Sequence, residues 1–263
     1  MEPSSSPSDT VRTTLPAVAK VGAGAPFRWL GGAWSDLWKA PFPCLAYGLA
    51  LSAFSLWFTL TVYAHGASHW IFALSCGFVF IAPLLAMGPY ETARRLERRQ
   101  KPTLLAMILV RDALRQDLAY LGLALLLIFG IWVGFAQIVY GLSTSQIHRN
   151  LPDLIAFATG TFEGRRMMVV GSLIGGAIAF FAYSLVVITA PMLLDRRNDV
   201  FMAVATSVRS VIMNFWPMVL WALILAALTL STAVTGFLGL TLVFPWLGLA
   251  SWRAYRELVP DAA

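Results

Sequence analysis

Long apolar stretches without an ionised side chain constrain this sequence more than any other feature. Six of them follow one another, and none contains Lys, Arg, Asp or Glu. A membrane-spanning helix needs about 20 mostly apolar residues, because the hydrocarbon core of a bilayer is roughly 30 Å thick. The sequence therefore predicts an all-α polytopic membrane protein with six transmembrane helices, at about residues 43–64, 69–90, 119–140, 168–191, 215–234 and 237–252.

The composition agrees with this prediction. Charged residues make up 12% of the 263 residues and apolar residues 59%, whereas soluble domains carry about 25% charged residues. These values exclude an ordinary soluble enzyme, a disordered chain and a disulfide scaffold, and they give no indication of nucleic-acid binding. Residues 1–26 are rich in Ser, Pro, Thr, Gly and Ala, so we expect a disordered cytoplasmic tail there. Residues 27–260 then form one six-span domain.

The basic residues between the spans predict the orientation. Lys and Arg number 16 on the side that holds both ends of the chain and only 3 on the opposite side. Cytoplasmic loops carry an excess of Lys and Arg. We therefore expect a multi-pass protein of the bacterial inner membrane with both termini in the cytoplasm.

The six spans form three similar hairpins, each preceded by a short amphipathic cytoplasmic helix. The segments that begin at Trp34, Val110 and Val208 align before spans one, three and five. In the first of these helices the bulky residues Phe27 and Trp29 recur at helical spacing with later tryptophans, which predicts an aromatic face lying in the membrane interface. The alternative is a chance similarity between Leu-rich segments.

A proline recurs near the cytoplasmic end of the second span of each hairpin. Pro83, Pro191 and Pro245 take this place. Proline removes a backbone donor and kinks a helix, so each one frees a carbonyl that a neighbour or water must satisfy. Gly171, Gly175 and Gly176 in span four, in contrast, favour close helix packing over ligand binding.

A basic collar surrounds the predicted cytoplasmic side. Its members are candidates for contact with anionic lipid headgroups or with another membrane protein: Arg94, Arg95, Arg98, Arg99, Arg111, Arg115, Arg196, Arg197 and Arg209. The alternative is a solvated helix that pairs its own charges, Glu91 with Arg95 and Arg94 with Glu97. The predicted partners are thus membrane lipids and possibly a second membrane protein, and no nucleic acid.

Three histidines lie on the predicted external side. His65, His69 and His148 would form a three-nitrogen copper or zinc site if they converge; exposed, hydrated imidazoles are the alternative. No sequence motif of a nucleophilic, metal-dependent or phosphate-binding enzyme is present. We therefore expect no enzymatic activity and no resident cofactor.

Three motifs resemble a known family. They are Pro83–Glu91 with Arg94–Glu97, Ala190–Arg196 with Ala203, Ser207 and Asn214, and Phe244–Pro245 with Trp252–Leu258. Together they resemble the predicted integral membrane proteins of proteobacteria that are grouped as a domain of unknown function, over roughly residues 27–260. The resemblance implies a bacterial source and an inner-membrane location, and it implies no activity.

Three functions remain open. The first is a non-enzymatic scaffold, assembly or lipid-organising protein. The second is a small-molecule transporter or permeation protein with a cleft between hairpins. The helices that proline is expected to break favour this function. The spans offer only Gln137, Tyr183, Ser184 and scattered hydroxyls, which argues against a proton relay. The third is an accessory subunit of a metal- or haem-containing membrane complex.

Overall fold

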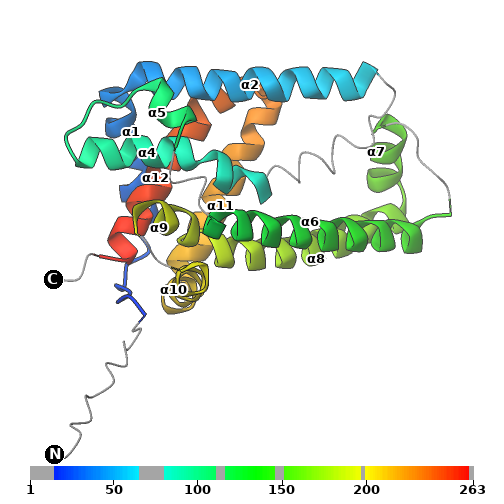
Figure 1. Ribbon diagram of the computed structural model, residues 1–263. Helices are drawn as coiled ribbons and strands as arrows, with labels where there is room; N and C mark the ends of the chain where they lie inside the picture. Colours follow the sequence, from blue (N-terminus) through cyan, green and yellow to red (C-terminus); the bar gives the residue numbers. More distant parts are fainter. Residues whose placement is uncertain (1–14, 65–79, 111–115, 146–150, 197–198, 261–263) are drawn as a thin grey trace, which may run out of the picture.

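Every regular element in the described part of the chain is helical (Figure 1). The computed structural model describes residues 15–64, 80–110, 116–145, 151–196 and 199–260. Its elements are α1 (Ala25–Lys39), α2 (Pro41–Ala64), α4 (Met87–Glu97), α5 (Leu104–Ile108), α6 (Gln116–Ser143), α7 (Leu151–Gly160), α8 (Phe162–Val186), α9 (Thr189–Asp195), α10 (Val200–Met213), α11 (Phe215–Ser231), the short 3-10 helix η2 (Thr232–Thr235) and α12 (Leu240–Leu258).

Four helical stretches in these residues are long and apolar enough to cross a membrane. They are Pro41–Val62, Gln116–Ser143, Phe162–Asp195 and Phe215–Thr235, and they correspond to predicted spans one, three, four and five. The third of them includes both α8 and α9. These stretches contain too few polar side chains to cover a helix in water, so their outward faces suit lipid.

The other two predicted spans are not confirmed. Span two was expected at 69–90, but residues 69–79 lie outside the described residues, and only Phe80–Leu85 and the first turn of α4 remain of it. Span six was expected at 237–252. Helix α12 covers most of this range, continues to Leu258, and carries Arg253, Arg256 and Glu257 in its last turns.

The helices are arranged in two zones. In Figure 1, α2, α6 and α8 run along a common direction, while α1, α4, α9 and the last turns of α12 gather at one end of them. Helix α7 lies at the opposite end, and α10 is seen almost end-on, so it runs across the direction of α6 and α8. Helix α12 packs against α1, α2 and α4 and links the two zones.

A tight turn joins α11 to α12, as the sequence predicted at Thr235-Gly236. The chain leaves η2 through Gly236, whose φ of 59° is left-handed, a conformation that glycine adopts at no steric cost. The amide of Phe237 donates to the carbonyl of Thr232 at 2.8 Å. The two helices therefore reverse direction within a few residues.

Small residues bring α6 and α8 together, as expected. A Cβ atom added to Gly175 would lie 3.1 Å from the Trp132 indole nitrogen, and one added to Gly171 would lie 3.8 Å from Val139. Gly176, which was predicted to share this packing face, points elsewhere, because a Cβ atom added to it would have no atom of another described element within 4 Å. Gly171 and Gly175 thus face α6, and their lack of side chains allows the close approach typical of membrane helices.

Helix α1 differs from the expected interfacial helix with one aromatic face. Ala25, Trp29, Ala33 and Leu37 are buried against the protein, whereas residues such as Trp38 on the other side are exposed. The spacing of four residues places the first group on one side of the helix. Helix α1 therefore divides its aromatic residues between the protein core and the outer surface, because the fold supplies α12 and α11 as packing partners.

Candidate functional site: the charged end

Helices α1, α4, α9 and α12 meet at one end of the molecule, which we call the charged end. Helix α12 contacts each of the other three, and α4 also contacts α9. The two ends of the described chain join here, since the Ala19 amide donates to the Leu258 carbonyl at 2.9 Å. Residues 15–26, the described part of the expected disordered tail, thus contribute defined contacts and the first residues of α1.

Large aromatic side chains form the core of the charged end. Trp29, Trp221, Trp252 and Tyr255 are almost completely buried. The rings of Trp29 and Trp221 meet edge to face with centroids 5.5 Å apart, and those of Trp252 and Tyr255 do the same at 5.5 Å. Such pairs add to the stabilisation that comes from burying large apolar area.

Both peripheral indoles of this core bind a carboxylate. The Trp29 indole donates to Glu257 at 2.8 Å, and the Trp252 indole donates to Glu97 at 3.0 Å. Arg28 pairs with Glu257 at 2.6 Å and Arg256 with Glu97 at 3.3 Å. The indole N–H groups of Trp29 and Trp252 are therefore satisfied by carboxylates that an arginine neutralises, whereas the indole nitrogen of the buried Trp221 has no hydrogen-bond partner among the described residues.

Three further carboxylates bind more than one partner each. Asp36 accepts from Lys39 at 2.8 Å and from Arg253 at 2.6 Å. Asp195 accepts from the Tyr255 hydroxyl at 2.8 Å and from Arg256 at 3.1 Å. These bonds connect α1 to α12 and α9 to α12, so they fix the relative positions of helices that are far apart in sequence.

Glu91 is the most buried of these carboxylates. It accepts from Arg94 at 2.7 Å and from Arg95 at 2.6 Å, both on its own helix. A second nitrogen of Arg94 reaches the Leu194 carbonyl of α9 at 2.8 Å. The predicted Glu91–Arg95 pair is confirmed. Arg94 pairs with Glu91 and not with the predicted Glu97, because Glu97 lies against α12.

The environment of Tyr255 shifts its acidity. Burial raises the pKa of the Tyr255 hydroxyl, and the nearby negative charge of Asp195 raises it further. Ionised phenolate is disfavoured in a desolvated site next to a carboxylate. The hydroxyl therefore stays protonated and serves as a hydrogen-bond donor to Asp195.

A groove of about 670 Å³ runs along the charged end between α1, α4 and α12. Its lining includes the charged residues Arg28, Lys39, Glu97, Arg253 and Glu257 and the buried Trp29 and Trp252. Glycine makes room for one of these groups, since a Cβ atom at Gly32 would lie 2.6 Å from the Arg253 guanidinium. The carboxylates of the groove are held in ion pairs, so the groove offers charge and shape but no unpaired carboxylate for proton transfer.

Two helix breaks lie beside the charged end, and a side-chain hydroxyl satisfies the backbone at each. Pro89 has no N–H to give the Leu85 carbonyl, which accepts from the Tyr47 hydroxyl at 2.7 Å. At the junction of α8 and α9, the Ser207 hydroxyl accepts from the Ile188 amide at 3.2 Å and donates to the Ser184 carbonyl at 2.8 Å. Ser207 thus replaces a helical hydrogen bond one turn before Pro191.

The collar arginines have several surroundings. Arg94 and Arg95 are held by Glu91, and Arg196 donates to the Val259 carbonyl at 2.9 Å. Arg98 is half-exposed at 4.0 Å from Asp195, and Arg99 and Arg209 are exposed. Arg111, Arg115 and Arg197 lie outside the described residues.

His65, His69 and His148 also lie outside the described residues, so their predicted metal site stays a prediction. Among the described residues, no group of three or more His, Cys, Asp or Glu side chains is placed to hold a metal ion.

Sequence reasoning did not predict the interhelical pairs of the charged end, although several of its residues lie in the motifs that carry the family resemblance. Asp36, Asp195, Arg253, Arg256 and Glu257 lie in the interhelical network, yet only local charge pairs were predicted. The sequence pattern around Arg253, Arg256 and Glu257 could have predicted this pairing, because these charged residues share a helix with Trp252, Tyr255 and Leu258. Charges embedded in an aromatic helix face indicate interhelical pairing and not a solvated tail.

The family comparison agrees with the apolar helices. Residues 71–195 match the model of a family described as a predicted integral membrane protein (DUF2189). The chain is a predicted integral membrane protein. The matched segment includes α4 to α9, hence Glu91, the collar of α4 and the break before Pro191. The description names no activity. No curated protein and no solved structure matches the chain.

Proposed function

We propose that the chain is a non-enzymatic protein of the bacterial inner membrane with a scaffold, assembly or lipid-organising role. The pairing of the buried carboxylates carries this proposal. Asp36, Glu91 and Asp195 have side chains no more than 12% exposed, and each holds two or more partners. A general acid or base must reach a substrate and exchange a proton with it. These carboxylates instead hold helices together.

The apolar rim of the charged end supports a role at the membrane surface. Trp38 of α1, Leu105 and Ile108 of α5, and Phe201 of α10 are exposed. Short amphipathic helices with such residues lie in the interface between headgroups and acyl chains. A rigid charged end surrounded by these helices is suited to hold lipids or a second membrane protein.

The proposal includes six spans with both termini in the cytoplasm. The chain segments before span one, after span two, after span four and after span six meet at the charged end. If the chain crosses the membrane an even number of times between one of these segments and the next, all four segments lie on the same side of the membrane. The 16 basic residues predicted for this side, against 3 for the other, support the cytoplasm as its location.

Cysteine labelling tests the topology. Single cysteines at Ser145 and at Arg98 are introduced into a chain whose two native cysteines, Cys44 and Cys76, are replaced by Ala. A membrane-impermeant thiol reagent added to intact cells should label position 145 and not position 98, and permeabilised cells should allow labelling of both. Labelling of position 98 alone in intact cells contradicts the proposed orientation.

Purification in mild detergent tests the role. We expect a specific membrane protein or anionic phospholipid to remain bound through gel filtration and to be lost at high salt, because exposed charges are screened. The double variant Arg98→Gln/Arg99→Gln should retain less of it, whereas Arg165→Gln/Arg166→Gln, at the opposite end, serves as the matched control. Equal retention by all three proteins contradicts a role for the collar.

Transport is the second candidate function. The breaks at Leu85 and Ile188 favour it, because broken membrane helices expose backbone groups that bind substrates and ions. At both sites, however, Tyr47 and Ser207 already satisfy the backbone groups. Measured flux of a small molecule into proteoliposomes, abolished by Ser207→Ala in a still-folded protein, would favour transport over the scaffold role.

The third candidate, an accessory subunit of a metal or haem complex, depends on the external histidines. Loss of one ligand of three should lower copper or zinc binding by at least about tenfold. Metal analysis of His65→Ala and His148→Ala checks this. Unchanged metal content in both variants removes this candidate.

A further inference from the structure

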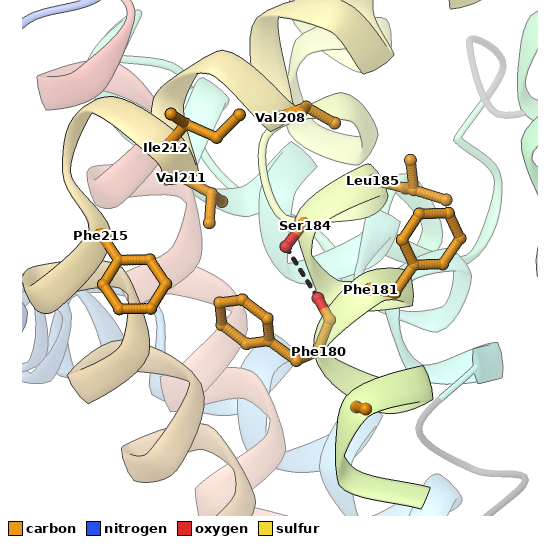
Figure 2. Close-up of a pocket in the computed structure, with 9 residues that line it drawn as sticks. Phe180, Phe181, Ser184, Leu185, Val208, Val211, Ile212 and Phe215 are labelled. Atoms are coloured by element: carbon orange, nitrogen blue, oxygen red, sulfur yellow. Dashed lines mark hydrogen bonds between the residues drawn. The ribbon is translucent and has the colours of Figure 1, made fainter. Parts of the chain in front are cut away.

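An apolar groove lies between α8, α10 and α11, away from the charged groove. Its volume is about 300 Å³. Figure 2 shows Phe180, Phe181 and Leu185 of α8 on one side and Val208, Val211, Ile212 and Phe215 on the other. The only polar side chain in the lining is Ser184, and its hydroxyl donates to the Phe180 carbonyl of its own helix at 2.8 Å. The lining therefore offers apolar contact and little else.

The position of this groove suits a lipid chain. Two of its walls, α8 and α11, belong to candidate membrane spans, and α10 crosses at one end of them (Figure 1). Phe181, Ile212 and Phe215 line the groove and are still exposed at its edge. An acyl chain in the surrounding bilayer can enter without unfolding any element. A headgroup cannot, because an apolar lining leaves its polar atoms unsatisfied.

Two exposed cations, Arg209 and Lys20, lie near the α10 and α11 residues that line the groove. Arg209 is one helical turn before Ile212, and it is exposed. Lys20 is also exposed, and the Asn214 side chain holds the residues on both sides of it. Asn214 accepts from the Val21 amide at 2.8 Å and donates to the Ala19 carbonyl at 3.0 Å. Asn214 itself lies between Ile212 and Phe215, so this clamp brings Lys20 to the junction of α10 and α11.

We propose that this groove binds one acyl chain of an anionic phospholipid, whose phosphate is bound by Arg209 and Lys20. The inference rests on the proposed lipid-organising function and names its ligand and site. An apolar groove with two exposed cations near its α10 and α11 wall matches a molecule with one apolar tail and one negative headgroup. A second copy of the chain would need a broad apolar face, and a soluble phosphate ester would leave the groove empty.

Lipid binding to the purified, full-length protein tests the site. The protein is delipidated in detergent, and phosphatidylglycerol or phosphatidylcholine is added back and counted by native mass spectrometry. Each basic residue near a phosphate contributes at most about fivefold. The double variant Lys20→Gln/Arg209→Gln should therefore lower phosphatidylglycerol binding by about tenfold and phosphatidylcholine binding by less, because the choline cation offsets the charge of the phosphate. Arg165→Gln/Arg166→Gln, two exposed arginines at the opposite end, is the matched charge control and should change the binding of neither lipid.

A second pair of variants tests the groove itself. Ala177→Phe fills it from α8, whereas Val169→Phe adds similar bulk at an exposed position two turns away on the same helix. The first variant should lower the binding of both lipids by about tenfold, and the second should leave both unchanged. Glycerol 3-phosphate, which has the charge without the chain, should not displace phosphatidylglycerol at millimolar concentration.

Each outcome has one meaning. Unchanged binding in both Ala177→Phe and Lys20→Gln/Arg209→Gln overturns the proposed site. If Arg98→Gln/Arg99→Gln loses phosphatidylglycerol binding and Lys20→Gln/Arg209→Gln does not, the result supports the lipid-organising function but contradicts this binding site. Displacement by glycerol 3-phosphate shows that the cations bind a phosphate ester without the groove. A thermal-unfolding midpoint equal to wild type confirms that a variant is folded.

Discussion

The charged end and the α6–α8 pair hold helices together by different means. At the charged end, ion pairs and indole hydrogen bonds connect α1, α4, α9 and α12 around buried aromatic rings. Between α6 and α8, glycine and an aromatic ring, Gly175 and Trp132, provide the contact. Most residues of α6 are exposed in the described structure, whereas most of the second half of α12 is buried.

The different surroundings of the two regions, lipid for the α6–α8 pair and water for the charged end, explain why they are held together differently. Apolar side chains gain little by leaving lipid for another apolar surface, so membrane helices rely on close packing of small residues. Outside the hydrocarbon core, burial of Trp and Tyr rings removes apolar area from water and stabilises the fold strongly. We therefore expect substitutions at the charged end and along α12 to cost more than substitutions between α6 and α8.

The largest effect is expected where α12 meets α2. A Cβ atom at Gly48 would lie 2.1 Å from the Thr241 carbonyl oxygen, a backbone atom that cannot move aside. Gly48→Val should destabilise the protein by about 3 kcal/mol or more, at the upper end of overpacking. Thermal unfolding in detergent measures this. Gly175→Val is the matched variant in α8, where the Trp132 ring can shift, and an equal loss in both would contradict the comparison.

The next effect is expected from the buried ion pairs. Glu91→Gln removes the buried carboxylate that Arg94 and Arg95 both bind, which costs about 3 kcal/mol. Arg28→Gln breaks the exposed pair with Glu257 and should cost less than about 1 kcal/mol. Unfolding midpoints at low salt compare the two. A greater loss of stability in Arg28→Gln than in Glu91→Gln would show that solvent exposure does not determine how much each ion pair stabilises the protein.

A smaller effect is expected at the break between α8 and α9. Ser207→Ala leaves the Ile188 amide and the Ser184 carbonyl without their partner, and an unsatisfied buried polar group costs about 1–3 kcal/mol. The control is Ser184→Ala, whose hydroxyl bonds only within its own helix and should change stability by a few tenths of a kcal/mol. Both are measured by thermal unfolding. Equal midpoints for the two variants would exclude a bridging role for Ser207.

The smallest effect concerns pH. The folded protein raises the pKa of Tyr255, so its hydroxyl stays neutral at a pH where an unfolded Tyr, with a pKa of about 10, ionises. Stability should therefore be lost as the pH rises above about 10, by up to about 1.4 kcal/mol per pH unit, and this contribution should be constant below that pH. Unfolding midpoints between pH 9 and 11 check it. Tyr255→Phe should have a shallower slope, and an unchanged slope rules out Tyr255 as its source.

Several features were predictable because they depend on neighbours in sequence. The Glu91–Arg95 pair follows from helical spacing, the turn at Gly236 from the conformational freedom of glycine, and the packing role of Gly175 from its position in an apolar helix. The division of α1 into a buried and an exposed face was not predictable. Phe27 and Trp29 are both aromatic, and only the presence of α11 and α12 decides that Trp29 is buried.

Hydropathy, glycine and proline positions and the count of basic residues determine by themselves that this chain is apolar, helical and built for a membrane, because these properties depend on each segment and its solvent. The tertiary structure alone decides which charges meet. Asp36 and Arg253 are separated by most of the chain, as are Asn214 and the backbone around Lys20. Their pairing depends on the three-dimensional course of α12 and α11, since hydrogen bonds and ion pairs act only over a few ångströms.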